Sequence, residues 1–113
     1  MNLKYIYKII DNNEWKLAQK KGFYVGSKKD LNDGFIHFSA EEQVESTLKK
    51  YFSNEKNLTL LKIDTLKLNH LIWEQTSDGS MFPHLYSVLD IQNVISNESI
   101  ILNDDGAYKL VQQ

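Results

Sequence analysis

The chain has 113 residues, of which 42% are hydrophobic and 25% are charged, and this balance favours one folded domain over a disordered chain. It has no cysteine, which excludes disulfides, thiol catalysis and thiolate metal sites. All 13 basic residues are lysine and the net charge is −2. Arginine is the usual bidentate ligand of phosphate and guanine, so we expect no nucleic-acid partner.

The opening MNLKYIYKII is too short and too interrupted by lysine for a signal peptide or a membrane span. A cytoplasmic protein without a membrane partner is therefore expected.

The first third of the chain predicts a strand, a helix and a second strand. Residues 3–10 are rich in Tyr and Ile and end at a polar turn, which is typical of a strand. Residues 14–21 are expected to form a short helix, capped by Asn12 or Asn13 and ended by Gly22. We then expect extended or irregular chain over 23–29, a turn over 30–34 and a strand over 35–38.

Ser39 is the predicted start of a second helix. The segment SAEE at 39–42 matches a capping box, in which Ser39 caps the helix and Glu42 reaches back. Apolar residues at helical spacing carry this helix to about residue 52.

The remainder of the chain predicts short strands joined by turns. Pro83 lacks a backbone N–H, so its strand is expected at a sheet edge or bent. The segments are strands over 57–64, 70–75 and 81–86, an ambiguous stretch over 91–95, and a C-terminal hairpin within 96–113 that turns at 104–106. Two helices and several short strands with short connections predict a single α+β domain over residues 1–113 with a split, mostly antiparallel sheet.

A strand that leads into the second helix carries the first group of candidate site residues, GFIHFS at 34–39. Alternate side chains of a strand face opposite ways, so if Ile36 and Phe38 face the core, His37 and Ser39 lie side by side on the other face. The following helix N-terminus offers free backbone N–H groups to an anionic or carbonyl-bearing ligand. The alternative is that Ser39 only caps the helix and His37 is a structural histidine.

The second group lies in FPHLY at 82–86, where His84 and Tyr86 share a face by the same alternation. Both side chains have a flat face and a polar tip, which suits a wall for a ring-bearing ligand; packing alone is the alternative. Glu74, next to Trp73, is the candidate general base or ribose-binding carboxylate, and burial near the indole would raise its pKa. Its alternative role is to face solvent while Trp73 takes the core.

Several kinds of site are not expected. The three histidines, His37, His70 and His84, have no metal-ligand spacing, so no metal is predicted. The chain has no nucleophile elbow, no dinucleotide fingerprint and no P-loop. A nucleophilic serine is also unfavoured, because residues 37 and 39 lie parallel on one strand.

Taken together, GFIHFS at 34–39, Trp73-Glu74 and FPHLY at 82–86 resemble the family of domain of unknown function 952. The opening IYKI at 6–9, Trp15 and Gly22 also fit its pattern, and the resemblance covers about residues 4–95. The family comprises small bacterial and plant proteins, and its fold is grouped with ADP-ribosyltransferase-like folds, in which a cleft of a split sheet holds NAD.

The resemblance implies site residues by motif. Lys8 stands at the first-strand position, where related sequences often carry His, and His37 and Ser39 stand at the second. The late carboxylate position is open: Glu74, or the pair His84 and Tyr86, could serve. Catalytic roles are thereby implied for His37, Glu74 and Tyr86, and ligand binding for Lys8, His37, Ser39, His84 and Tyr86. Lysine has no ring and cannot reproduce the hydrogen-bond directions of imidazole.

Three functions remain open from the sequence. The first is an ADP-ribosyl-type transferase with NAD as its substrate. The second is a module that binds a nucleotide or another small metabolite without turnover. The third is a protein interaction module with structural histidines. We predict that His37, Ser39, His84 and Tyr86 meet at one cleft, with His37 and His84 within the roughly 15 Å that one small-molecule pocket allows.

Overall fold

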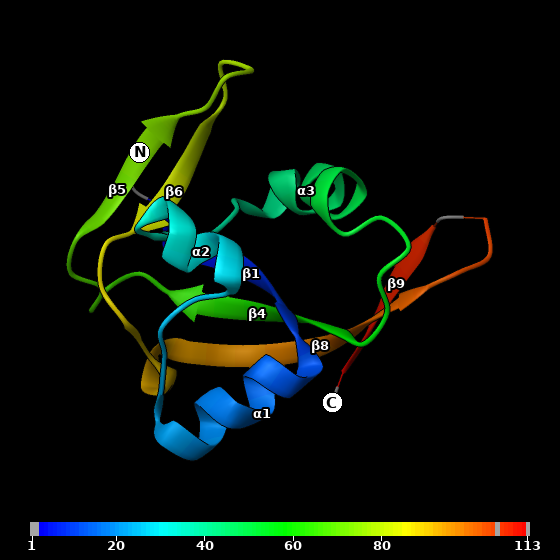
Figure 1. The fold of residues 1–113 in the computed structure, drawn as a ribbon, viewed down its shortest axis with the longest axis horizontal. Coiled ribbons are helices and arrows are strands. Elements are labelled where there is room, and N and C mark those ends of the chain that lie inside the picture. Colours follow the sequence, from blue (N-terminus) through cyan, green and yellow to red (C-terminus); the bar gives the residue numbers. More distant parts are fainter. Residues whose placement is uncertain (1–2, 106, 113) are drawn as a thin grey trace.

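Four strands form the largest sheet of the computed structural model, which describes residues 3–105 and 107–112. All of their pairings are antiparallel, and the order is β1-β4-β8-β9 (Figure 1). The strands are β1 (Tyr5–Asp11), β4 (Leu58–Asp64), β8 (Val94–Leu102) and β9 (Tyr108–Gln112).

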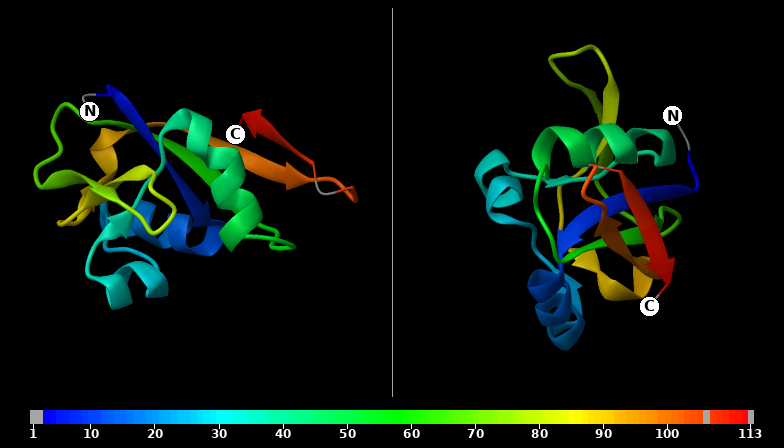
Figure 2. Two further views of the ribbon diagram at one scale, coloured as in Figure 1. Left: turned by 90° about the horizontal axis from the view of Figure 1, so that it is seen from above. Right: turned by 90° about the vertical axis from the view of Figure 1, so that its right-hand side faces the viewer.

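Two smaller antiparallel sheets and the helices complete the fold. The three-stranded sheet has the order β3-β6-β5, and its β5–β6 hairpin projects away from the four-stranded sheet (Figures 1 and 2). Its strands are β3 (Ile36–His37), β6 (Met81–Leu85) and β5 (Leu71–Gln75), and β2 (Phe23–Tyr24) pairs with β7 (Leu89–Asp90). The helices are α1 (Asn12–Lys21), α2 (Lys28–Asp33) and α3 (Val44–Tyr51), with the 3₁₀ turns η1 (Glu41–Gln43) and η2 (Ile91–Asn93).

The four-stranded sheet is covered on both faces, so β1 is buried along most of its length. Ile6 and Ile10 face one apolar cluster, to which α1 contributes Trp15. Tyr7 and Ile9 face a second cluster, which includes residues of α3. Figure 1 shows α1 and α3 on opposite sides of this sheet. The predicted α+β class and split antiparallel sheet are confirmed, and no helix of the described residues is long and apolar enough to cross a membrane.

The prediction of two helices was wrong, because the described residues hold three α-helices. The additional helix, α2, replaces the expected irregular segment and turn. Ser27 caps it by accepting from the backbone N–H of Asp30, and Asp30 accepts from the backbone N–H of Ser27 in return. The capping box is therefore at residues 27–30.

Two predicted helix caps were also wrong. The cap of α1 is Asp11, whose carboxylate accepts from two backbone N–H groups of the first turn. Ser39 does not cap a helix, since its backbone N–H and C=O pair with those of Tyr7. The turn η1 follows Ala40, whose N–H donates to the Gln43 side chain, and α3 begins only at Val44.

Pro83 lies on the central strand of its sheet, β6, so the prediction of an edge strand was wrong. The C=O of Pro83 accepts from the N–H of Phe38, just beyond the two-residue strand β3. In an antiparallel pair, the N–H and C=O of one residue point to the same side. The missing N–H of Pro83 therefore faces the end of β3, where only one ladder bond is lost.

The C-terminal segment forms the predicted hairpin from β8 and β9, and β8 begins at Val94, within the stretch whose structure the sequence left ambiguous. The predicted turn over 104–106 includes Gly106, which lies outside the described residues, as do residues 1–2 and 113 of the predicted domain.

Candidate functional site

A cavity of about 610 Å³ opens where the four-stranded sheet meets the three-stranded sheet. Its volume is that of an ordinary small-molecule site. Five stretches of chain contribute side chains to it: β1 and the start of α1 (7–14), the region of α2 (24–30), β3 and its flanks (35–39), α3 and the following loop (46–55), and the β5–β6 hairpin (76–84).

Aromatic side chains form one wall of this cavity. His37 and His84 are paired residues of β3 and β6, and their ring centroids lie 5.4 Å apart. Phe35 stacks on His84 with a centroid distance of 4.1 Å and an interplanar angle of 22°. Ile36 and Leu85 are next to these histidines in the chain and point to the opposite face of the sheet, where they are buried in the core. Strand alternation thus separates core residues from cavity residues in both motifs, except that the buried Phe38 also lines the cavity.

Asp30 is the buried centre of a polar network behind this wall. Its side chain is 2% exposed and lies 2.9 Å from the buried Nζ of Lys8. Asp30 also accepts hydrogen bonds from the backbone N–H groups of Ser27 and His37. Burial alone would raise the pKa of Asp30, but the hydrogen bond from His37 and the charge of Lys8 outweigh it and hold that pKa below its ordinary value. Burial lowers the pKa of Lys8, and the charge of Asp30 opposes that shift.

His37 is held by carboxylates at both ring nitrogens. Its Nδ1 lies 2.5 Å from an oxygen of Asp30, and its Nε2 lies 3.0 Å from an oxygen of Asp33. The Nδ1 contact is a hydrogen bond, and the Nε2 contact with Asp33 is an ion-pair approach. The two carboxylates hold the ring in place, so it serves as an anchored wall.

His84 has a different environment, because its Nδ1 alone has a partner. It lies 2.9 Å from Oε1 of Glu74, and the hydroxyl of Tyr86 donates to the same oxygen at 2.5 Å. These bonds, first that from Tyr86 and then that from His84, lower the pKa of Glu74. The expected raised pKa was therefore wrong: Glu74 shares a strand face with His84, not with Trp73, and accepts two hydrogen bonds instead of lying buried.

Hydroxyl groups also line the cavity. Oγ of Ser39 lies 3.2 Å from Oγ1 of Thr47 on α3, and both residues line the cavity. Ser39 is thus available as a polar wall group and not as a helix cap. Lys28 and Lys50 also line the cavity, and no carboxylate of the described residues forms an ion pair with either.

The structure brings four of the sequence-predicted site residues to one cavity: Lys8, His37, Ser39 and His84. Glu74 and Tyr86 do not line it and connect to it only through His84. The separation of His37 and His84 is well within the roughly 15 Å that one small-molecule site allows. Lys8 is in reach of a ligand, but its charge is already committed to Asp30.

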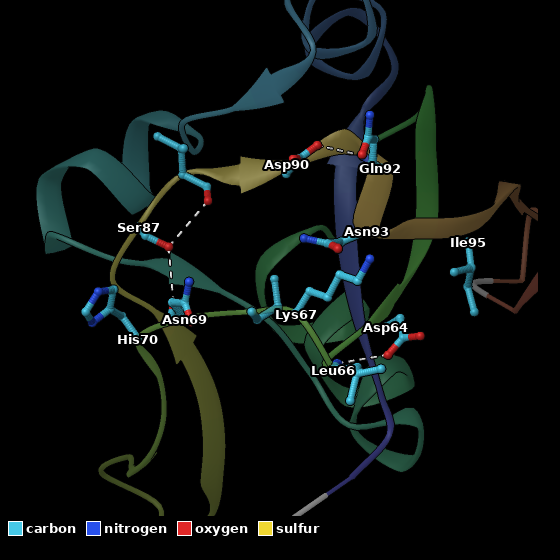
Figure 3. A pocket seen from close by; sticks show the side chains of 12 residues that line it. Asp64, Leu66, Lys67, Asn69, His70, Ser87, Asp90, Gln92, Asn93 and Ile95 are labelled. Atoms are coloured by element: carbon cyan, nitrogen blue, oxygen red, sulfur yellow. Dashed lines mark hydrogen bonds between the residues drawn. The ribbon is translucent and has the colours of Figure 1, made fainter.

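The third histidine, His70, lies at a different cavity of about 540 Å³, and no residue lines both. Figure 3 shows this cavity, with His70 at one edge, Ile95 at the opposite edge and Lys67 between them. The ring of His70 has no partner among the described residues. Nor does the described part of the chain hold any group of three or more His, Cys, Asp or Glu side chains that could bind a metal ion.

Sequence reasoning missed Asp30, Asp33 and the stacking role of Phe35. The signal for Asp30 was present, since Ser27 and Asp30 have capping-box spacing and Gly34 follows as a helix end. No local pattern shows that the same carboxylate also meets Lys8, 22 residues away in sequence.

Comparison with known proteins places these residues in a wider group. Residues 9–97 match the family described as a protein of unknown function, DUF952. The chain belongs to this family. The match includes the buried carboxylate of Asp30 and both cavity histidines, while Lys8 lies one residue before it.

Solved structures of one DUF952 relative have the same fold as this chain. The crystal structure of protein CC0527 from Caulobacter crescentus is 40% identical, covers 93% of each chain and has a TM-score of 0.87. A double mutant of CC0527 gives the same values, and its solution NMR structure is 41% identical over 92% of this chain and 90% of that one, with a TM-score of 0.81. Among curated proteins, none matches the chain.

Proposed function

We propose that this DUF952 protein binds a small, ring-bearing molecule in the cavity between its two main sheets, and that the ligand is a nucleotide of the NAD type. The observation that carries this proposal is the aromatic wall of Phe35, His37 and His84 inside a cavity of about 610 Å³. Aromatic rings bind flat heterocycles by stacking, and a few polar groups then fix orientation.

The remaining lining suits the rest of a nucleotide. The hydroxyls of Ser39 and Thr47 can bond to ribose hydroxyls, and the unpaired cations of Lys28 and Lys50 can meet phosphate. An interaction module needs no such cavity, and this favours the small-molecule function over it.

A second candidate function is ADP-ribosyl transfer from NAD, which the resemblance to ADP-ribosyltransferase-like folds implies. Glu74 supports it, since its carboxylate is hydrogen-bonded to both His84 and Tyr86. Such a transfer needs a carboxylate that can stabilise a cationic transition state. Asp30 is the carboxylate that contacts the aromatic wall, and it is already paired with Lys8 and His37. Glu74 does not line the cavity and reaches it only through His84. The geometry therefore favours binding over transfer.

Calorimetric titration with NAD, ADP-ribose and nicotinamide tests the proposal. Phe35→Leu removes the stacking ring from the cavity wall, and a loss of stacking should weaken binding by about tenfold. His70→Ala is the matched control, because it removes an aromatic ring from the other cavity and should leave affinity unchanged. Binding that is absent at millimolar ligand, or equally weakened by both variants, would contradict a site at this wall. Release of nicotinamide from NAD by the wild type would favour the transferase.

A further inference from the structure

The two cavity histidines differ in which ring nitrogens are occupied, and this difference determines what kind of ligand atom the cavity can recognise. His37 has a carboxylate at each nitrogen. His84 has one at Nδ1, and the described residues offer no partner to its Nε2. Every fully buried side-chain nitrogen or oxygen of the described residues has a hydrogen-bond partner, so Nε2 of His84 is accessible, on a residue that lines the cavity.

Glu74 determines which nitrogen of the neutral His84 ring carries the proton. An ionised carboxylate only accepts hydrogen bonds, so Nδ1, at 2.9 Å from Oε1, must be the donor. A neutral imidazole has one N–H, and Nε2 is then left as an acceptor. Tyr86 is a second donor to the same oxygen and keeps this carboxylate in place.

Phe35 restricts how a ligand can approach this acceptor. It covers one face of the His84 ring at a centroid distance of 4.1 Å, and His37 packs against that ring in a T-shaped arrangement at 5.4 Å. His84 as a whole is only 6% exposed. A ligand therefore meets His84 at its ring edge, where Nε2 is the polar atom.

We propose that Nε2 of His84 is the recognition atom of the cavity and accepts a hydrogen bond from its ligand. The cavity would then select ring-bearing molecules with an N–H donor at the ring edge, such as a carboxamide, over the isosteric carboxylates. This inference rests on the proposed function and specifies the chemistry of its ligand. Glu74 and Tyr86 are positioning residues for His84.

Nicotinamide and nicotinate are the probes, because they share one ring and differ only in amide against carboxylate. The two affinities are compared at a pH at which the ¹⁵N shifts of the His84 ring show a single protonated nitrogen. The wild type should bind nicotinamide at least tenfold more tightly than nicotinate. The cavity lining holds both lysines and carboxylates, so a charge control is needed to separate this recognition from a general effect of charge on the anion.

Glu74→Gln is the decisive variant, because a glutamine amide can donate to Nδ1 and move the ring proton to Nε2. The nicotinamide preference should then fall by about tenfold or reverse. Glu55→Gln is the matched control: it removes the same charge from a residue that lines the cavity and has no side-chain partner among the described residues. Its affinity ratio should change far less than that of Glu74→Gln, because it alters the charge of the lining but not the ring proton of His84.

A measurement without ligand distinguishes a failure of the His84 inference from a failure of the proposed binding function. The ¹⁵N shifts of the His84 ring should show the proton on Nδ1 in the wild type and a shift toward Nε2 in Glu74→Gln. A proton on Nε2 in the wild type, or equal affinity ratios in the two glutamine variants, would overturn the inference while leaving the cavity as a binding site. Failure of both ligands to bind, with the proton on Nδ1, would instead overturn the proposed function and this preference with it.

Discussion

The Asp30→Asn substitution should be among the most destabilising changes in the cavity region. It removes one charge of a buried ion pair whose side chains are 7% and 2% exposed, and leaves the Lys8 ammonium in the core without a counter-charge. Breaking a buried pair in this way costs about 3–5 kcal/mol. At a urea m-value of about 1.5 kcal/mol/M, a loss of about 3 kcal/mol lowers the midpoint by about 2 M.

Lys8→Met in the Asp30→Asn background tests the cause of this loss. If the unpaired ammonium is responsible, its removal should restore part of the stability, so the double variant should unfold at higher urea than Asp30→Asn alone. A double variant no more stable than Asp30→Asn, or a single-variant loss below about 1 kcal/mol, would refute the reasoning.

The pH dependence of unfolding gives an independent check on the same pair. The pKa of Asp30 is lower in the folded state, so the unfolded state binds more protons in acid and wild-type stability should fall below about pH 4. In Asp30→Asn, burial lowers the pKa of Lys8 without opposition, so the unfolded state again binds more protons. That variant should therefore gain stability more steeply than the wild type as the pH rises above neutrality, because in the wild type the charge of Asp30 opposes the shift.

Three further predictions follow from the described contacts. Gly26→Ala should lower the thermal midpoint more than Gly22→Ala: both have positive φ, but a Cβ at Gly26 would lie 2.7 Å from a buried side-chain carbon and one at Gly22 meets open space. Burial and a neighbouring carboxylate raise the pKa of Tyr7 to about 12, so its stabilising contribution should be lost between pH 10 and 12, and unfolding curves of Tyr7→Phe should lack that loss. Tyr86→Phe should raise the pKa of Glu74 toward its ordinary value, which ¹³C carboxyl shifts would measure, and an unchanged pKa would contradict the hydrogen bond.

Strand alternation was enough to predict which residues of the two motifs share a face. Ile36 and Phe38 are buried in the core while His37 faces the cavity, as the pattern of residues 34–39 indicates. The helix caps were less predictable, because two serines, Ser27 and Ser39, both precede an acidic residue by three positions. The β-bridge between Ser39 and Tyr7 decides between them, and it joins segments 32 residues apart.

The position of Pro83 was mispredicted for a related reason. A proline has no N–H to donate, so it loses one hydrogen bond of the sheet wherever a neighbouring strand lies on that side. The sequence alone therefore favours an edge strand, which has no neighbour on one side. Here the neighbouring strand β3 is only two residues long and ends opposite the proline. A central strand therefore tolerates proline where its partner stops, and the length of a partner strand is a property of the tertiary structure.

The different chemistry of His37 and His84 shows where sequence reasoning stops for the site itself. Both are strand residues preceded by an apolar or proline residue, and they are register partners. His37 meets Asp30 and Asp33 because the helix α2 ends beside β3, whereas His84 meets Glu74 because β5 and β6 form a hairpin. One ring therefore has a carboxylate at each nitrogen, and the other keeps a nitrogen with no partner among the described residues. That asymmetry comes from which carboxylates the fold brings to each ring, and it makes His84, rather than His37, the residue whose substitution should change ligand preference.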